Sequence, residues 1–381
     1  MRVLSLFDGM SCGQIALRDM GITPEVYYAS EVDKFAIAQT QLNFPDTIQL
    51  GDVRLVDPTQ LGHIDLLIGG SPCQSFSFAG KRVGMATKEN EKVLTLDRYL
   101  ELKEQGFEFE GQSYLFWEYM RILTELRRLN PNIKFLLENV KMKKEWEAVL
   151  TEAIGVPGVH INSALVSAQN RKRIYWTNIS GIAQPEDRGL LLRDVLQKEV
   201  DEKYFLSDKM VQCLMNRKKT ERYSPRKFQP IETPFEVKSL CINARVQKMG
   251  DADNYVKISR KGEIRKDQDK ASCLTVGGHG AGNHSDMDLI VEPINKHLEK
   301  NLRSVNDKAQ CFLATSWKGA WANGMTLVES EPRIRRLTPT ECARLQTIPE
   351  WYTWQCSETQ QYKMLGNGWT VEVIKHIFSY L

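Results

Sequence analysis

The chain has 381 residues, of which 42% are hydrophobic and 26% are charged. A length of this size suggests two to three domains at about 150 residues each, and the composition excludes a disordered or collagen-like protein. No apolar run approaches the roughly 18 residues that a membrane span requires, and Asp8 comes too early for the apolar core of a secretory signal. We therefore expect a soluble, cytoplasmic protein.

Cysteine and histidine spacing gives no sign of a metal site. The 8 cysteines are scattered without a C-x-x-C pair, and the 6 histidines form no H-E-x-x-H motif. A zinc ribbon or a compact disulfide framework would need such regular spacing. We expect no bound metal, and most of the cysteines should be small buried hydrophobic residues.

Positive charge is concentrated in one part of the chain. The net charge is +3, but residues 203–270 hold 17 Lys and Arg against 9 Asp and Glu, a local excess of +8 that leaves −5 elsewhere. Such a run is either a solvated face or an electrostatic footprint for a phosphate backbone. On the second interpretation, the candidate DNA contacts are Arg217, Lys218, Lys219, Arg226 and Lys227.

The predicted elements of the first 140 residues alternate between strands and helices. Strands are expected at residues 1–7, 26–29, 64–69 and 133–137, and helices at 13–20, 34–42 and 114–129. The runs IDLLIG and IKFLL are continuously apolar, as in strands covered on both faces. This alternation predicts an α/β fold with a doubly wound, mostly parallel sheet, whose ligand sites lie at the carboxyl ends of the strands.

The middle of the chain has a different pattern. From about residue 181 it breaks into short polar segments, and it contains two similar stretches, at 269–292 and 307–329, that begin with D-K-A-x-C. We expect a second, smaller and irregular domain here. Helices are predicted again at 338–346 and 371–381, and the LDRYLELKEQG segment predicts an extra helix within 88–111, to which we assign no function.

Glycine and acidic residues follow the first three expected strands. The segment from Phe7 to Gly13 opens a helix, where backbone amides can receive the polar end of a ligand. It is not G-x-G-x-x-G, which disfavours a nicotinamide cofactor. Glu31 could hold a ribose hydroxyl pair, and Asp52 could accept a hydrogen bond from an adenine amino group. Each residue alone could equally be a cap or a surface charge.

Cys73 is the candidate nucleophile. It stands in Gly69-Gly70-Ser71-Pro72-Cys73-Gln74-Ser75, directly after a buried strand and behind Pro72. A thiolate on a sharp turn at the ligand-binding edge could be activated by a lowered pKa and by backbone amides. An arbitrary cysteine is more often a buried structural residue, but this context favours a reactive one.

Three further residues suggest acid and anion chemistry. Glu138, in Glu138-Asn139-Val140, follows the strand IKFLL, and a carboxylic acid in a partly apolar pocket can keep its proton and donate it. Arg171 and Arg173 alternate on an extended segment and should point to the same side. Their guanidinium groups could meet a phosphate or a carbonyl oxygen, although alone they also fit a surface basic patch.

In their order, these motifs resemble the cytosine-5 DNA methyltransferase family. They run F-D-G, E-V-D, G-D-V, P-C-Q, E-N-V and Q-N-R-K-R, followed by R-L-T-P at 336–339 and L-G-N-G at 365–368. The resemblance covers residues 1–180 and 334–381 and implies a catalytic domain of the S-adenosylmethionine-dependent type. It also implies that residues 181–333 are the target-recognition domain.

Some positions differ from the usual family pattern. The last motif usually ends Gly-Asn-Ser-Val, whereas this chain has Gly366-Asn367-Gly368-Trp369. That tryptophan, together with Ser5 and the L-F-W-E segment at 115–118, is similar to the mammalian de novo enzymes and their phage-like relatives.

The resemblance implies a mechanism and a cofactor. Cys73 would add to carbon 6 of a cytosine flipped out of duplex DNA, Glu138 would bind and protonate N3, and Arg173 with Arg171 would hold O2 or a nearby phosphate. Gln74 and Ser75 would close over the base. S-adenosylmethionine would donate the methyl group and leave as S-adenosylhomocysteine, bound by Phe7, Gly9, Met10, Glu31, Asp52, Pro72, Leu115, Asn367 and Trp369.

Three other functions remain open: a transfer-RNA cytosine methyltransferase, a catalytically silent DNA-binding regulator, and a methylase of free nucleotides. The substantial middle domain favours double-stranded DNA as the partner, and the intact Cys73, Glu138 and arginine pair favour an enzyme. We expect a monomer. The sequence allows a cognate restriction endonuclease within a restriction–modification system, or a stand-alone role in protecting host or phage DNA, and the recognition site is not encoded in any motif.

Overall fold

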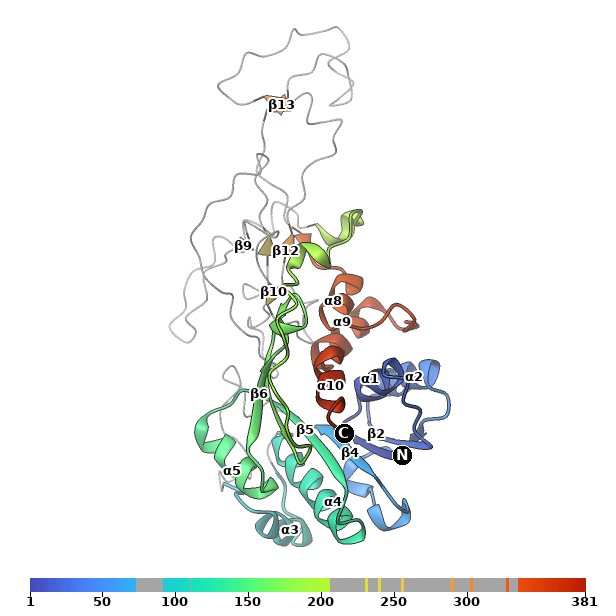
Figure 1. Ribbon diagram of the computed structural model, residues 1–381, viewed down its shortest axis with the longest axis vertical. Helices are drawn as coiled ribbons and strands as arrows, with labels where there is room; N and C mark the ends of the chain where they lie inside the picture. The colour runs from blue at the N-terminus through green and yellow to red at the C-terminus, as the bar shows by residue number, and fades with distance from the viewer. Residues whose placement is uncertain are drawn as a thin grey trace.

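The computed structural model describes residues 1–72, 92–109, 111–205 and 335–381, together with six two-residue strands between residues 230 and 328. The described body is an α/β structure built around one sheet, with helices packed on both of its faces (Figure 1). The expected fold class is confirmed. Cys73, Gln74, Ser75, the five basic candidates at 217–227 and the two similar stretches at 269–292 and 307–329 lie outside the described residues, apart from the short strands.

The sheet has seven strands in the order β3-β2-β1-β4-β5-β8-β6. Five of them run parallel: β3 (Ile48–Gln49), β2 (Val26–Ser30), β1 (Arg2–Leu6), β4 (Leu66–Gly70) and β5 (Lys134–Val140). The last two, β8 (Lys172–Thr177) and β6 (Gly158–Asn162), are joined by antiparallel pairing, and β8 also pairs antiparallel with β5. The carboxyl ends of β1, β2, β4 and β5 therefore meet at one edge.

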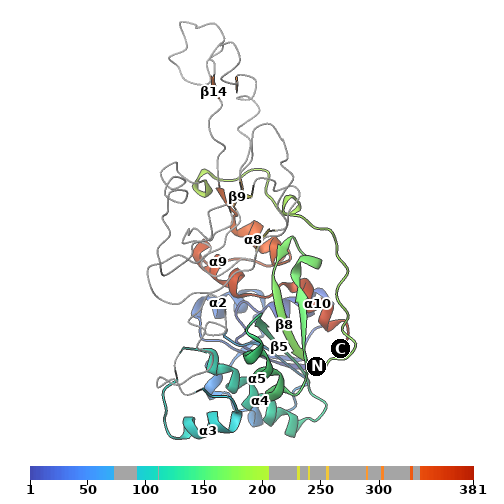
Figure 2. The same cartoon turned by 90° about the vertical axis from the view of Figure 1, so that its left-hand side faces the viewer.

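Alternate residues of the central strands pack into two hydrophobic cores, one on each face of the sheet. Val3 and Ile68 belong to the core under α1 (Cys12–Asp19), α2 (Lys34–Asn43) and α10 (Val371–Phe378), while Leu4 and Leu67 belong to the core under α4 (Phe116–Leu129) and α5 (Lys144–Ile154). Both faces of these strands are buried, which explains why their sequences are continuously apolar. Figure 1 shows α4 and α5 on one side of the strands and α1, α2 and α10 on the other, and Figure 2 looks from the side of α4 and α5.

The two ends of the chain meet in this body. Helix α10 packs against α1, and the N- and C-termini lie side by side in both views (Figures 1 and 2). Two further helices, α8 (Pro339–Leu345) and α9 (Glu358–Asn367), lead into α10. Residues 181–205 also contact this body, since Leu192 and Val195 are buried in the same core as α1. The boundary near residue 180 stays a prediction.

The remaining elements are short. Helix α3 (Leu96–Glu104) is the extra helix expected within 88–111. The 3-10 helices and the two-residue strands have the following bounds: Val53–Leu55 (η1), Pro58–Gln60, Ser113–Leu115, Ser163–Leu165, Leu192–Asp194, Glu202–Tyr204, Gln169–Asn170 (β7), Pro230–Ile231, Ser239–Leu240, Tyr255–Val256, Leu289–Ile290, Leu302–Arg303, Leu327–Val328 and Arg335–Arg336 (β15).

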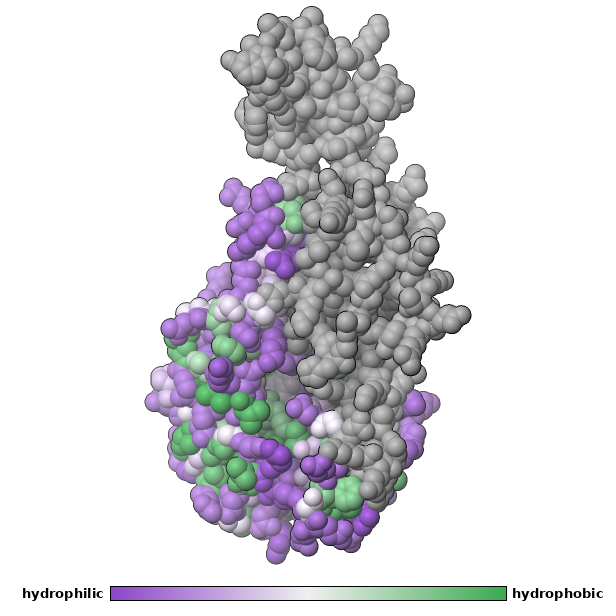
Figure 3. Space-filling view, turned by 180° about the vertical axis from the view of Figure 1, so that it is seen from behind, coloured by the Kyte–Doolittle hydropathy of each residue, from purple (hydrophilic) through white to green (hydrophobic). Residues whose placement is uncertain are grey.

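The surface of the described body is mixed in character. Hydrophilic and hydrophobic residues are interspersed on the face seen in Figure 3. No helix within the described ranges is long and apolar enough to cross a membrane.

Candidate active site

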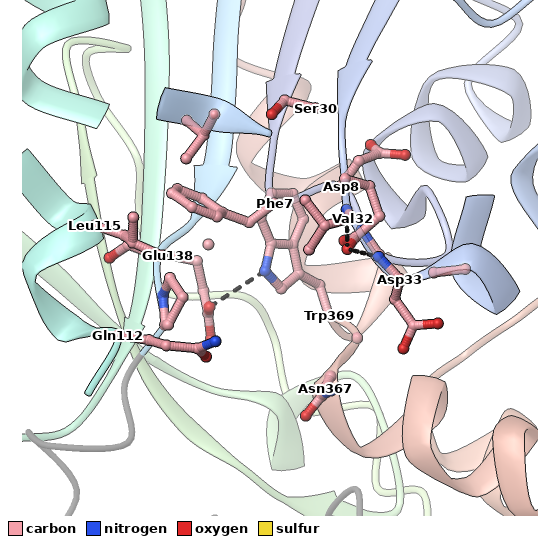
Figure 4. Close-up of a pocket in the computed structure, with 18 of the residues that line it drawn as sticks. Phe7, Asp8, Ser30, Val32, Asp33, Gln112, Leu115, Glu138, Asn367 and Trp369 are labelled. Carbon is pink, nitrogen blue, oxygen red and sulfur yellow. Dashed lines mark hydrogen bonds between the residues drawn. The ribbon is translucent and has the colours of Figure 1, made fainter. Parts of the chain in front are cut away.

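One pocket of about 710 Å³ lies at the carboxyl edge of the sheet. Its walls are the segments that follow β1, β2, β4 and β5 and the end of α9 (Figure 4). Arg173 of β8 and Arg171, which precedes that strand, also line it. The residues that line it and were expected to bind cofactor are Phe7, Gly9, Glu31, Asp52, Pro72, Leu115, Asn367 and Trp369. Met10 is instead buried, and its carbonyl oxygen accepts a hydrogen bond from Tyr352 at 2.9 Å.

The turn after β1 brings backbone amides to the pocket. Phe7, Gly9 and Ser11 all have positive φ, of 59°, 58° and 65°, a conformation that costs energy for residues other than glycine. Gly9 donates its backbone N–H to Oε2 of Glu31 at 2.8 Å. Glu31 Oε1 accepts from the N–H groups of Val32 and Asp33 at 2.7 and 2.8 Å. The carboxylate that ends β2 is thus held in place by three backbone donors.

Asp8 differs from Glu31 because its Oδ2 atom is buried. Tyr27 donates its hydroxyl to Asp8 Oδ1 at 2.9 Å, and in Figure 4 the Asp8 carboxyl group points away from the centre of the pocket. Burial raises the pKa of Asp8 to about 6, although nearby Ser5, Ser11 and Tyr27 act in the opposite direction. Ionisation of Asp8 therefore lowers the free energy of unfolding.

Asp52 and its neighbours also line the end of the pocket that holds Glu31. Arg54 donates to both carboxylate oxygens of Asp52, with its Nε at 3.0 and 2.9 Å, and this hydrogen bonding lowers the pKa of Asp52. Asp52 stays ionised and can accept a hydrogen bond from a ligand's amino group. Across the pocket mouth, Lys363 of α9 forms an ion pair with Asp33, the N-cap of α2. Sequence reasoning missed Lys363, because only the packing of α9 against α2 brings it here.

The extra helix α3 is tied to this same end through a buried glutamate. Glu118 of α4 is fully buried and accepts from Tyr99 at 2.6 Å, from Lys103 at 2.5 Å and from Arg121 at 2.7 Å. Arg121 also donates to the carbonyl oxygens of Val53 and Val56, next to Asp52. Helix α3 therefore supports the loop that carries Asp52.

The other end of the pocket holds Glu138 and Arg173. In the antiparallel register, Glu138 of β5 faces Tyr175 and Val140 faces Arg173, so Glu138 and Arg173 are diagonal neighbours on one face. The Arg173 Nε atom lies 2.9 Å from Glu138 Oε1, and both side chains are about nine-tenths buried (7% and 11% exposed). Trp369 Nε1 donates to Glu138 Oε2 at 3.2 Å.

The two arginines are placed differently. Arg171 donates to the carbonyl oxygen of Gly366 at 3.3 Å and to that of Gly368 at 2.8 Å. Both guanidinium groups line the pocket, but Arg171 holds the segment before α10 while Arg173 holds the carboxylate. The sequence pattern predicts that they share a side and does not distinguish these two partners.

Asn139 connects this end to the loop that leads to Cys73. Its Nδ2 donates to the Ser71 carbonyl oxygen at 3.2 Å and to Ser71 Oγ at 3.0 Å. Ser71 is buried and is followed by Pro72, which lines the pocket. The chain is therefore fixed against β5 two residues before Cys73, the first residue beyond the described range.

Comparisons with known proteins agree with this geometry. The family model described as C-5 cytosine-specific DNA methylase matches residues 1–154 and 163–381. The chain belongs to the C-5 cytosine-specific DNA methylase family. It is therefore a cytosine-5 DNA methyltransferase, as the order of motifs predicts.

Two of its relatives come from a phage and a bacterium. It is 26% identical to the orphan methyltransferase M.SPRI of Bacillus phage SPR, with 100% of this chain and 97% of the relative covered. It is 24% identical to the type II methyltransferase M.HgiCI of Herpetosiphon aurantiacus, over 99% of this chain and 96% of that protein.

Among solved structures, the fold is similar to that of DNMT2 from Spodoptera frugiperda, with a TM-score of 0.57 at 17% identity, over 100% of this chain and 98% of that one. It is also similar to the methyltransferase EhMeth of Entamoeba histolytica, with a TM-score of 0.59 at 14% identity, over 100% and 97% of the two chains.

Proposed function

We propose that the enzyme transfers a methyl group from S-adenosylmethionine to carbon 5 of a cytosine that is flipped out of a specific site in duplex DNA, through a covalent bond between Cys73 and carbon 6. The observation that supports this most directly is the Glu138–Arg173 pair at the inner end of the pocket. It stands beside Gly70, three residues before Cys73 along the same strand and loop.

The pocket fits the proposed cofactor in the chemistry of its donors and acceptors. At one end, Glu31 and Asp52 offer carboxylates for ribose hydroxyls and an adenine amino group, and Phe7 and Leu115 offer apolar walls. Gly9 and Asn367 also line the pocket. When bound, S-adenosylmethionine supplies an electrophilic methyl group and is released as S-adenosylhomocysteine. Within the described part of the chain, no cluster of three or more His, Cys, Asp or Glu residues could hold a metal ion.

The protein's own residues would make cytosine reactive in steps. Addition of the Cys73 thiolate to carbon 6 breaks the C5–C6 double bond and places electron density on carbon 5, which can then form a bond to the methyl carbon. Glu138 donates a proton to ring N3 as negative charge develops there. Arg173 holds Glu138 and offers positive charge to O2 or to a phosphate. Loss of the carbon 5 proton to water, elimination of the Cys73 thiolate and return of the N3 proton to Glu138 release 5-methylcytosine and restore the enzyme.

Extrusion of the target base costs a few kcal/mol, and contacts in the pocket would offset it. Gln74 and Ser75 are proposed to close over the base. Arg217, Lys218, Lys219, Arg226 and Lys227 are proposed to contact phosphates, because positive charge in 203–270 fits a DNA backbone.

The relatives come from bacteria and phages, so we propose that a monomer acts in the cytoplasm of a bacterial or phage-infected cell. The relatives' names include both orphan and type II enzymes, which is compatible with either a stand-alone role or a cognate endonuclease.

The experiment is transfer of tritium from methyl-labelled S-adenosylmethionine to unmethylated duplex DNA, followed by bisulfite sequencing. Wild type should label carbon 5 of cytosine in one short sequence context, and Cys73→Ser should give no label while still binding the cofactor. Wild-type protein that binds cofactor but leaves varied duplex DNA unlabelled would contradict the proposal, and labelling of transfer RNA in parallel would replace DNA by RNA as the substrate.

A further inference from the structure

The indole ring of Trp369 reaches from the start of α10 to the catalytic end of the pocket. Its Nε1 donates to Oε2 of Glu138 at 3.2 Å (Figure 4). Arg173 Nε lies 2.9 Å from Oε1 of the same carboxylate. Among the residues that the structure describes, each oxygen of the carboxylate therefore has one donor. Because a carboxylate oxygen can accept two hydrogen bonds, each oxygen keeps one acceptor position for a substrate.

The backbone behind this indole is anchored on both sides. Before Trp369, the carbonyl oxygen of Gly368 accepts from the buried Arg171 at 2.8 Å. After it, Thr370 donates its hydroxyl to Gln346 at 2.9 Å. The segment cannot shift without breaking these buried hydrogen bonds, so the place of the indole N–H depends only on the side-chain torsions of Trp369.

Gly70, at the end of β4, leaves the space in which Trp369 and Glu138 meet. A Cβ atom at this position would lie 2.9 Å from Trp369 Nε1 and 3.2 Å from Glu138 Oε2. Contacts this short are rare for real Cβ atoms, and the first neighbour is a rigid ring rather than the end of a flexible chain. Glycine at position 70 is therefore required for close approach and not for backbone conformation.

We propose that Trp369 is a positioning residue for Glu138, so that the indole N–H fixes the plane of the carboxyl group that meets N3 and the exocyclic amine of the flipped cytosine. This inference rests on the proposed function. Arg173 alone would hold one oxygen and leave the carboxyl group able to turn about its last bond. With a second donor on the other oxygen, the two open positions keep one direction, so that one can carry the proton delivered to N3 and the other can accept from the exocyclic amine.

The simpler role for Trp369 is a wall of the cofactor site, and Trp369→Phe separates the two. Phenylalanine keeps an aromatic ring but lacks the N–H. If the N–H positions Glu138, the single-turnover methylation rate at saturating DNA and cofactor should fall about tenfold, since a hydrogen bond to a charged group is removed. The cofactor dissociation constant, measured by calorimetry, should change little.

Trp351→Phe is the matched control. Trp351 Nε1 also donates to a carboxylate, Asp19 Oδ1 at 2.9 Å, and Trp351 does not line the pocket. The same chemical change there should leave the methylation rate at the wild-type value. Gly70→Ala places a Cβ atom against the hydrogen bond between Trp369 and Glu138. It should reproduce the rate loss of Trp369→Phe. Thermal unfolding of each variant shows whether it is folded before its rate is compared.

The decisive arm combines Trp369→Phe with Glu138→Gln. If the indole acts through Glu138, the tryptophan substitution should cause no further tenfold loss once the carboxylate is gone. An equal loss in both backgrounds would overturn the inference, and so would an unchanged rate in folded Trp369→Phe or a loss confined to cofactor affinity. The proposed function is tested separately by wild type beside Cys73→Ser, so a failure of that function would appear as absent label before any Trp369 variant is compared.

Discussion

Two buried arginine–glutamate pairs of this enzyme show how different surroundings give the same chemical groups different uses. Arg335 and Glu341 both have 0% of their side chains exposed, and Arg335 Nη1 lies 2.9 Å from Glu341 Oε2. A second contact joins Nη2 to Oε1 at 3.0 Å. Backbone N–H groups of Thr338 and Gln197 add one further donor to each oxygen, both at 2.8 Å. Every side of this carboxylate is taken, and the pair closes the N-terminus of α8.

Arg173 and Glu138 are nearly as buried, at 7% and 11% exposed. Glu138, however, lines the pocket and keeps acceptor positions that the indole of Trp369 and Arg173 do not fill. The comparison teaches that burial of an ion pair does not by itself indicate function. A pair with a full set of partners stabilises the fold, whereas a pair with open acceptor positions on a pocket can act on a ligand.

Glu138→Gln tests the chemical side of this comparison and should have the largest effect. The amide cannot supply the proton, so the methylation rate should fall by roughly 10²–10⁴-fold, the range for general acid catalysis. The free energy of unfolding should fall less than in Glu341→Gln, because Glu138 and Arg173 line the pocket and keep some exposure. Single-turnover methylation and urea unfolding measure the two effects. A rate near that of wild type would remove Glu138 from the reaction.

Glu341→Gln makes the same substitution in the closed pair and should do the reverse. It leaves the Arg335 charge buried without a carboxylate, which should lower the free energy of unfolding by about 3–5 kcal/mol. The rate per folded molecule should stay close to wild type. Glu145→Gln is the control, because Glu145 pairs with Lys92 on the surface with about half of each side chain exposed, and it should leave urea unfolding unchanged. A stable Glu341→Gln protein would mean that the closed pair contributes no net stability.

Asp8 extends the comparison to a third buried carboxylate. Among the described residues, its hydrogen bonds include no cationic partner, and Asp8→Asn tests what its charge does. Because the pKa of Asp8 is raised by burial to about 6, stability linked to this group is present below about pH 4 and is lost as the pH rises through 6. Asp8→Asn should therefore be more stable than wild type at pH 7.5, by at most about 3 kcal/mol, and the advantage should vanish near pH 4.

Urea unfolding across this pH range measures the effect, and Asp33 provides a control of opposite sign. Burial acts to raise the pKa of Asp33, but the hydrogen bond from Lys363 and backbone N–H groups lower it overall. Its stabilising contribution is present at neutral pH and lost on acidification, so Asp33→Asn should destabilise most at neutral pH. An Asp8→Asn protein that is no more stable than wild type at pH 7.5 would show that the ionised Asp8 is adequately solvated.

Much of the fold could be predicted because doubly covered strands carry a strong signal. The strand expected at 1–7 is Arg2–Leu6, that at 133–137 is Lys134–Val140, and the helix expected at 13–20 is Cys12–Asp19. The extra helix within 88–111 and the helices near 338–346 and 371–381 are confirmed as well. The direction of a strand in the sheet could not be predicted in this way. The apolar run of β8 fits a parallel or an antiparallel strand equally, so its pattern does not encode the antiparallel pairing that places Arg173 beside Glu138.

For the site, the motifs identify the residues but not their partners. Glu138, Arg171 and Arg173 were all predicted from local sequence, yet the contact between Arg171 and Gly368 spans 197 positions and that between Trp369 and Glu138 spans 231. Such contacts depend on how α9 and α10 dock on the sheet. Lys363 and Gly70 were missed for the same reason, since their roles exist only after that docking. The roles of Glu138, Arg171 and Arg173 in the reaction stay predictions, as do those of Cys73 and of the basic residues at 217–227.

The packing of α10 on α1 has a consequence for the timing of synthesis. Residues 1–205 leave the ribosome first, and at about 5–20 residues per second roughly 6–26 s pass before residues 335–381 follow the stretch 206–334. During that interval α1 lacks its cover, and Ile15 and Ala16 await the apolar face of α10. The nascent chain also lacks Asn367 and Trp369, which complete the pocket wall. All seven strands of the sheet are already made by then, but methyl transfer should begin only after translation has passed the C-terminal helices, and until then the apolar surface that α10 covers stays exposed.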